Sequence, residues 1–542
     1  MRVVLALLLA AALAAPAAAQ NLVITGGPIY TGVESNPTAE VVVVQDGRIA
    51  YVGAAAQAPK PNPGAERIDL KGAALFPGFT DSHAHLRGIG ERELSLNLEG
   101  AKSAAEAIAR VKAYLDQRKP SAPVWGRGWI ETGWPEGRFL DRADIDAIAP
   151  DLPVLLTRAD GHALVANTAA LKAAGIDETT PSPPGGEILK GPDGRLTGML
   201  VDNAMRLVAK LQTAPTEADR REAFAAAFKV EAAYGWTGVH SMSVAWADVA
   251  LLEQLASEGK APLRVYNAVD AAEAGPLFAS GPRATEDGRI TTRAVKLYQD
   301  GALGSRGAAL FAPYADAPGA RGLVRTPPEQ MRAAMEKAKA AGIQVASHAI
   351  GDRGNAGVLD LYAGLGVEGL RWRIEHAQVV RPADITRFRT LGVIASMQPS
   401  HAIGDLHFAP ARLGDARLDG AYAWKSMREA GVTVLGGSDA PVERGDPLIE
   451  FYAAVARKDL AGFSGPDWRP GEKLSRAEAL ALFTSAAAYA RFAEVELGTI
   501  EVGKRADLSA FSVDLMTAPE ADIPKGRAVL TVVDGKVVYR AP

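Results

Sequence analysis

Residues 75–85 decide the fold: they read LFPGFTDSHAH, an apolar stretch of strand length that ends in two histidines. Side chains two positions apart in a strand lie on the same face, so His83 and His85 can contact one metal ion. A His-x-His pair alone is weak evidence for a metal site, because such pairs also occur by chance on surfaces. The interpretation therefore depends on what the rest of the chain places beside this pair.

The segments beyond this stretch alternate between short apolar strands and Ala-rich helices, which is typical of a parallel sheet. Eight such units predict an α/β fold, the closed (β/α)8 TIM barrel. An open doubly wound sheet is the competing architecture, but the sequence contains no Gly-rich phosphate loop of the expected form. The candidate strands are Leu75–Ser82, Trp236–Ser241, Leu263–Ala268, Ala294–Asp300, Ile343–His348, Arg371–His376, Val393–Gln398 and Val432–Asp439.

Metal-ligating residue types recur where these candidate strands end. His348 ends the fifth strand, His376 the sixth and Asp439 the eighth. Because the carboxyl ends of barrel strands meet in one mouth, we expect these three to converge with His83 and His85. Separate capping roles would leave the shared placement unexplained. Imidazole and carboxylate ligands suit Zn²⁺, with Mn²⁺, Fe²⁺, Co²⁺ or Ni²⁺ as alternatives, and ligands drawn from across a barrel favour an open catalytic site.

Two regions depart from the βα alternation. About 150 residues separate the first candidate strand from the second, which predicts an inserted subdomain at about 120–210. Strand-like segments with Asp-Gly turns near both ends of the chain predict a small β-sandwich formed by both termini. The expected organisation is a signal peptide over 1–19, a β domain over 20–74 and 496–542, and the barrel over 75–495.

The N-terminus has the layout of a secretory signal. Arg2 precedes 13 apolar residues, Val3–Ala15, and small residues precede an expected cut after Ala19. The run is shorter than the roughly 20 residues that a spanning helix needs. An uncleaved anchor or a core helix is the alternative. We expect a periplasmic or secreted protein without a stable membrane span after cleavage.

The composition excludes several classes of protein. The chain has 542 residues, of which 48% are hydrophobic and 23% charged, as in soluble globular proteins rather than disordered or multi-span membrane proteins. A net charge of −4 argues against nucleic-acid binding through a basic surface. The absence of cysteine excludes disulfides, thiolate zinc ligands and a Cys nucleophile. We expect a small-molecule partner and leave a homo-oligomer open.

Together these motifs resemble those of the metal-dependent amidohydrolase superfamily. Residues 77–85, PGFTDSHAH, are similar to its first-strand motif, and His348, His376 and Asp439 match its later ligands in order. The closer resemblance is to the YtcJ-like branch, which includes N-substituted formamide deformylase. It rests on VKLYQDGALGSR at 295–306, SHAIGDR at 347–353, GGSDAP at 436–441, LGTI at 497–500, KRADL at 504–508 and RADGH at 158–162.

The resemblance implies hydrolysis of a non-peptide amide-type C–N bond, such as that of an N-formyl or N-acyl amine, by a metal-activated water. By similarity to binuclear members, Lys296 on the fourth strand carries a carboxylate formed with CO₂ and bridges two metals. Burial would lower the pKa of this amine and permit that reaction. Alternatively, Lys296 pairs with Asp300 or Asp81. We expect Zn²⁺, as two ions if Lys296 is carboxylated and otherwise as one.

Asp439 is the expected catalytic residue: it would bind metal, accept the proton of the water and pass that proton to the leaving nitrogen. His162, Arg158 and Arg306 are weaker candidates for orienting a substrate carbonyl or carboxylate. For each arginine, an ion pair that holds a loop is the alternative. Other functions remain: a mononuclear deaminase of a cyclic amidine, a lactone or phosphoester hydrolase, and a non-catalytic barrel, which the complete ligand set disfavours.

The three remaining histidines carry no assigned role. His240 ends the second candidate strand and could face the barrel mouth. His401 and His407 follow the seventh strand, and we expect both to be solvated or to pack within a loop.

Overall fold

The computed structural model describes residues 21–131, 134–158, 163–183, 186–212, 214–304, 306–465 and 468–542. The expected signal at 1–19 and the candidate His162 lie outside the described residues. Two compact units are present, one containing the chain up to Ile89 and Ala227–Pro542, the other Gly90–Ala226. Within the described ranges, every helix is too short or too polar to cross a lipid bilayer.

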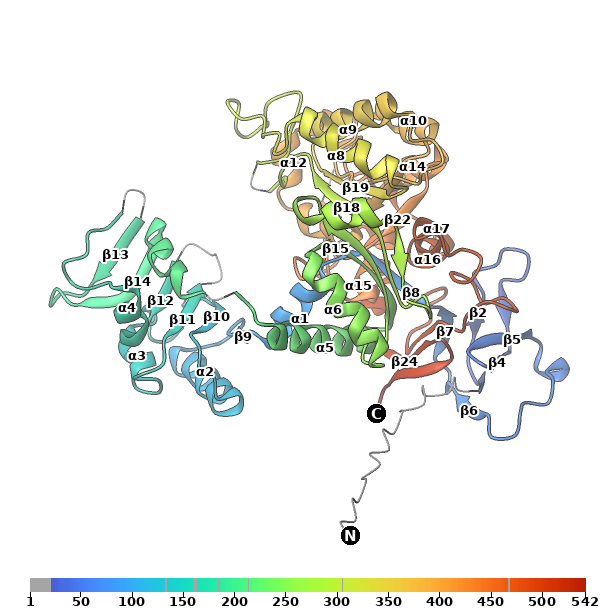
Figure 1. Ribbon diagram of the computed structural model, residues 1–542, viewed down its shortest axis with the longest axis horizontal. Helices are drawn as coiled ribbons and strands as arrows, with labels where there is room; N and C mark the ends of the chain where they lie inside the picture. The colour runs from blue at the N-terminus through green and yellow to red at the C-terminus, as the bar shows by residue number, and fades with distance from the viewer. Residues whose placement is uncertain are drawn as a thin grey trace, which may run out of the picture. The chain divides into compact units, whose positions relative to one another are not determined.

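Eight parallel strands form a nearly closed barrel in the first unit, which confirms the expected architecture (Figure 1). The chain closes the gap between the first and last strands through its backbone, because Asp439 N–H donates to the carbonyl of His83 at 2.7 Å. In order around the barrel, the strands are β8 (Phe79–Ala84), β15 (Trp236–Val244), β16 (Arg264–Asp270), β18 (Ile290–Tyr298), β19 (Gln344–Ala349), β20 (Arg373–His376), β21 (Ile394–Met397) and β22 (Val434–Gly436).

The first candidate strand is two strands, not one, which corrects the sequence-based boundary. β7 (Ala74–Pro77) pairs with strands of a terminal sheet, and the barrel strand β8 begins only at Phe79. Gly78 separates them: a Cβ atom there would lie 2.4 Å from Thr237 Oγ1, and its N–H donates to the carbonyl of Asp507 at 2.8 Å. An apolar run has the same appearance whether it serves one sheet or two, so this break is not visible in the sequence.

Helices cover the outer face of the barrel. Helices α8 (Pro328–Ala340) and α9 (Asp352–Leu365) pack against β19. In α8, Pro328 opens the first turn and Lys337 and Lys339 close the last, as the helix dipole favours. The other helices of the barrel are α6 (Trp246–Ser257), α7 (Gly275–Ser280), α10 (Pro382–Leu391), α11 (Pro399–Asp405), α12 (Ala409–Leu413), α13 (Asp415–Leu418), α14 (Trp424–Glu429), α15 (Pro447–Ala456), α16 (Arg476–Phe483) and α17 (Ser485–Ala490).

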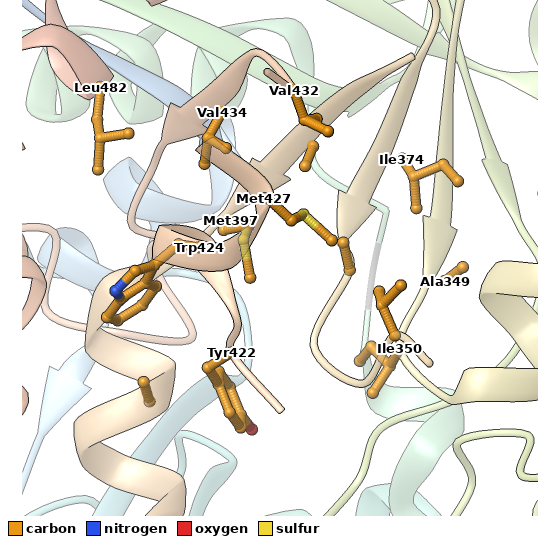
Figure 2. Close-up of a cluster of buried hydrophobic side chains, with 14 of the residues drawn as sticks. Ala349, Ile350, Ile374, Met397, Tyr422, Trp424, Met427, Val432, Val434 and Leu482 are labelled. Atoms are coloured by element: carbon orange, nitrogen blue, oxygen red, sulfur yellow. The ribbon is translucent and has the colours of Figure 1, made fainter. Parts of the chain in front are cut away.

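One large hydrophobic cluster joins these helices to the strands. Figure 2 shows part of it, with Met397 from β21 beside Met427 and Trp424 from α14. Ile350, at the end of β19, belongs to the same cluster and also lines the cavity described below. Close packing of this kind holds the strand ends, and hence the side chains they carry, in fixed positions.

Both ends of the chain contribute to two further sheets. Hairpin turns at Asp46-Gly47 and Asp534-Gly535 have positive φ at both residues, as two-residue hairpins require. Side chains of both sheets share one hydrophobic cluster, for example Val42 and Leu530. One sheet contains β5 (Arg48–Gly53), β4 (Val41–Gln45), β1 (Leu22–Thr25) and β6 (Glu66–Asp69); the other contains β25 (Lys536–Arg540), β24 (Ala528–Val533), β23 (Leu508–Phe511), β7, β2 (Ile29–Tyr30) and β3 (Thr38–Ala39).

The second unit has its own sheet and its own core. Trp129 and Trp134 are buried there, and their indole N–H groups donate to the carbonyls of Leu156 and Ala101. Helices α1 (Leu86–Leu94) and α5 (Glu217–Tyr234) lead into and out of it. Its other elements are β9 (Leu96–Asn97), α2 (Ala104–Arg118), β10 (Val124–Trp129), α3 (Arg142–Asp146), β11 (Val154–Arg158), β12 (Ala163–Ala166), α4 (Thr168–Ala174), β13 (Gly186–Lys190) and β14 (Leu196–Asp202).

Candidate metal centre

The candidate ligands from distant parts of the chain line one cavity in the barrel unit. Its volume is about 350 Å³. The strands and the loop after β22 bring to it His83, His85, Lys296, His348, His376 and Asp439. A cavity of this size is typical of a site for a small molecule.

A buried network fixes the first of these histidines. His83 donates from Nδ1 to Glu375 Oε2 at 2.5 Å, and Arg373 holds the same carboxylate from Nε at 2.6 Å. Burial, and next the charge of Lys296, lower the pKa of His83 to about 4, so its ring is neutral. A neutral ring with its hydrogen on Nδ1 presents the Nε2 lone pair to the cavity.

Two further histidines are oriented in the same way. His85 donates from Nδ1 to the carbonyl oxygen of Met242 at 3.1 Å. His376 donates from Nδ1 to Gln398 Oε1 at 2.8 Å. Burial, followed by the neighbouring rings of His348 and His83, lowers the pKa of His376 well below its ordinary value. The neutral His376 ring therefore presents Nε2 as an acceptor, and Nε2 is also the nitrogen that His85 directs at Asp439.

The donor set fits a divalent cation. Asp439 Oδ1 lies 3.4 Å from His83 Nε2 and 3.2 Å from His85 Nε2, and it is buried without a hydrogen-bond partner among the described residues. Two imidazole nitrogens and a carboxylate oxygen are thus gathered at one point, which is the kind of donor set that binds a divalent cation. His83, His85 and Asp439 offer ligand atoms within 4.8 Å of one another.

Left-handed backbone turns two of these side chains toward the cavity. His376 has φ 74° and Asp439 has φ 61°, a region that few residues other than glycine adopt. In a regular strand, His376 and its neighbour Glu375 would face opposite sides of the sheet. The positive φ at His376 breaks this alternation, so His376 lines the cavity while Glu375 supports His83.

Lys296 lies in the barrel interior near the C-terminal end of β18. It is 1% exposed, and its Nζ lies 3.4 Å from His83 Nε2. Burial is the main cause that lowers the pKa of Lys296 to about 8. In the described part of the chain Lys296 forms no ion pair with Asp300 or Asp81, so that alternative is wrong.

Those two carboxylates hold loops instead. Asp300 accepts backbone N–H groups from Ala309, Ile350 and Gly351 at 2.8–2.9 Å. Asp81 accepts the N–H and the hydroxyl of Ser438, at 2.9 and 2.5 Å, which ties the loop after β22 to β8.

His348 lies beside His376 in the same cluster. Its ring centroid is 4.5 Å from that of His376, and its Nε2 is 3.5 Å from Asp300 Oδ1. Burial, and next the charge of Lys296, lower the pKa of His348 to about 3, so this ring is also neutral. Its Nε2 has no hydrogen-bond partner among the described residues.

The sequence profile described as the amidohydrolase family matches residues 66–539. The chain belongs to this family. YtcJ of Bacillus subtilis strain 168, itself named only as a candidate amidohydrolase, is 35% identical over 95% of this chain and 98% of its own length. N-substituted formamide deformylase of Arthrobacter pascens is 27% identical over 96% of this chain and 98% of its own.

A solved structure agrees with this membership. An uncharacterized metal-dependent hydrolase from Pyrococcus horikoshii OT3 superposes with a TM-score of 0.76 and 28% identity, covering 92% of this chain and 99% of that one. This amidohydrolase is therefore a metal-dependent hydrolase that acts on carbon–nitrogen bonds.

One histidine of this amidohydrolase that was expected to be solvated lies at the site. His401, in α11, is 8% exposed, lines the cavity and has its Nε2 3.7 Å from Asp439 Oδ2. The expectation for His401 is wrong. A signal was available in the sequence, because His401 follows the seventh strand closely, as the ligands follow theirs.

The other two histidines lie outside the cavity lining and contact other protein side chains. His240 is buried away from the cavity lining and accepts a hydrogen bond at Nδ1 from Arg373 at 2.9 Å. His407 is 55% exposed and contacts Asp459 at 3.0 Å, in keeping with the loop role expected for it.

Both candidate arginines of this amidohydrolase form bidentate ion pairs. Arg306 donates to Asp316 at 3.1 and 2.9 Å, and its side chain is not part of the cavity lining. Arg158, in the second unit, donates to Glu131 at 2.8 and 2.9 Å. These contacts match the loop-holding alternative, and the substrate-binding roles of both residues stay predictions.

Proposed function

We propose that this amidohydrolase hydrolyses small N-formyl or N-acyl amines. The observation that carries the proposal is the donor set at the cavity, in which His83 Nε2 and His85 Nε2 lie 3.4 and 3.2 Å from Asp439 Oδ1. The resemblance to N-substituted formamide deformylase across nearly the whole chain supports the choice of bond. The cavity volume of about 350 Å³ favours a small substrate over a polymer.

The ligand residues would hold a divalent ion, which, when bound, lowers the pKa of a water molecule and polarises a carbonyl group. Asp439 then does the proton transfer: it accepts a proton as the water oxygen bonds to the carbonyl carbon, and donates it to the nitrogen as the C–N bond breaks. The products are a carboxylic acid and an amine. Apolar side chains of Leu303, Phe408 and Val442 at the same cavity suit an apolar substituent on that amine.

We further propose Zn²⁺ as the metal, bound as two ions bridged by carboxylated Lys296. The support is geometric: Lys296 is buried without a carboxylate partner among the described residues and lies beside His83 Nε2. Burial of an ammonium group is costly, and carboxylation would replace that cation by an anionic group able to bind metal. If Lys296 is a free amine, the site binds one ion.

We propose export as the third part of the function. Its support is the N-terminal sequence, in which a short basic start, an apolar run and small residues precede Gln20. An exported enzyme would meet amides from outside the cell. N-terminal sequencing of the protein recovered from its host tests this directly, since mature protein would begin near residue 20.

The test of the reaction uses the full chain loaded with Zn²⁺ and a panel of N-benzyl amides with formyl, acetyl and butyryl groups. We expect release of benzylamine, loss of activity after chelation and recovery when Zn²⁺ is restored. A lactone, a phosphodiester and a cyclic amidine belong in the same panel. Turnover of one of these alone, or full activity after exhaustive chelation, would contradict the proposed reaction.

A further inference from the structure

Nε2 of His401 is a buried polar atom of the cavity to which the ligand set gives no role. The ring is 8% exposed, lines the cavity, and has no hydrogen-bond partner for this nitrogen among the described residues. A buried donor or acceptor without a partner costs free energy. A group that binds in the cavity is the natural partner for it.

The hydrogen-bond partner of the other ring nitrogen fixes what His401 can do. Gln378 Nε2 lies 3.0 Å from His401 Nδ1. An amide nitrogen only donates, so Nδ1 accepts and the ring hydrogen lies on Nε2. The backbone of Gln378 is held, because its carbonyl accepts the N–H of Tyr422 at 2.6 Å.

This arrangement is the reverse of that at the metal ligands. His83, His85 and His376 each donate from Nδ1, which leaves Nε2 as the nitrogen available to a metal. His401 has its Nε2 near His376 and Asp439, within the 4.8 Å expected of ligand atoms, but a nitrogen that carries hydrogen cannot bind a metal. Proximity alone would make His401 a ligand, whereas its hydrogen-bonding makes it a donor.

The groups around His401 Nε2 indicate which kind of atom could accept its hydrogen bond. Nε2 lies 3.7 Å from Asp439 Oδ2 and 3.9 Å from Glu443 Oε1, both beyond hydrogen-bond range. An oxygen bound beside Asp439 would be in reach of this N–H. On the proposed reaction, the oxygen that gains negative charge as water adds to the carbonyl carbon is such an atom.

We propose that His401 is a catalytic residue that donates a hydrogen bond from Nε2 to the carbonyl oxygen of the substrate and to the oxyanion formed from it. The inference rests on the proposed function for the identity of that oxygen. His401 would act beside the metal and would not be one of its ligands.

The experiment compares His401→Ala and His401→Asn with His407→Ala, a matched control on the exposed histidine of the same segment. Three quantities are measured on the full chain: metal ions per chain, the Kd of acetohydroxamate for the Co²⁺-loaded protein, and kcat for N-benzylformamide. The hydroxamate is an oxygen ligand for the metal, and its binding does not depend on which amide the enzyme hydrolyses.

We expect His401→Ala to keep its metal content, to bind acetohydroxamate about 10-fold more weakly, and to lose about 100-fold in kcat, as when one oxyanion donor is removed. His401→Asn keeps an N–H donor and should recover part of both losses. His407→Ala should match the wild type in all three.

Loss of a metal ion from both His401 variants would overturn the proposal in favour of a ligand role. An unchanged hydroxamate Kd in His401→Ala, or failure of the wild type to bind the hydroxamate at all, would overturn it as well. A wild type that binds hydroxamate but does not cleave any amide would instead contradict the proposed function and leave the donor role decided by the Kd values.

Discussion

Two walls of one cavity carry buried histidines that hold their hydrogens on opposite nitrogens. On the wall formed by the ends of β8 and β20, His83 and His376 donate from Nδ1 to Glu375 and Gln398. On the α11 wall, His401 accepts at Nδ1 from Gln378. Glutamine appears on both walls, with its oxygen toward one ring and its nitrogen toward the other. The residue behind the ring therefore decides whether a histidine serves as a metal ligand or as a hydrogen-bond donor.

The largest effect should come from the residue that both walls face. Asp439→Asn keeps one oxygen for the metal but removes the carboxylate that accepts a proton, so we expect kcat to fall by about 10³-fold or more. Metal content should stay close to that of the wild type. Single-turnover rates and metal analysis check this, with Asp415→Asn, on an exposed carboxylate, as the control. Near-normal turnover in Asp439→Asn would exclude it as the base.

The second-largest effect is expected at Glu375, which holds His83 on the wall formed by the ends of β8 and β20. Glu375→Gln weakens the hold on the Nδ1 hydrogen of His83 and leaves Arg373 buried without its counterion. We expect metal affinity to fall by about 10- to 100-fold, measured by competition with a chelator. Glu494→Gln alters the half-buried pair with Arg371, which is not part of the cavity lining, and should leave metal affinity unchanged.

Equal metal affinity in Glu375→Gln and the wild type would show that the orientation of His83 does not depend on this carboxylate. The contrast between the two walls would then rest on His376 alone. The thermal midpoint of Glu375→Gln should be recorded beside the affinity, because a buried arginine that loses its partner also destabilises the fold.

The strand ends of the barrel were predictable because the patterns that mark them can be read from the sequence alone. Apolar runs of strand length mark the strands, and the ligands follow them directly, as with His83 and Asp439. The break at Gly78 was not predictable, since it depends on the position of Thr237, far away in the chain.

The supporting residues were missed for a related reason. Glu375 precedes His376 and, by the two-residue period of a strand, should face away from it; only the left-handed backbone at His376 shows that both serve the site. The role of His401 depends on which atom of Gln378 lies against its ring. No spacing in the sequence encodes that choice.

The smallest expected effect concerns a residue that belongs to neither wall. Arg306 was a candidate for binding substrate, but in the structure its guanidinium is paired with Asp316 and is not part of the cavity lining. We expect Arg306→Ala to change kcat/KM by less than about twofold and the thermal midpoint by less than about 3 °C, since exposed ion pairs contribute little. Steady-state kinetics and a melting curve measure both. A large increase in KM with unchanged kcat would contradict this prediction. Arg306 would then contact the substrate through a movement of its loop, in addition to the two walls compared above.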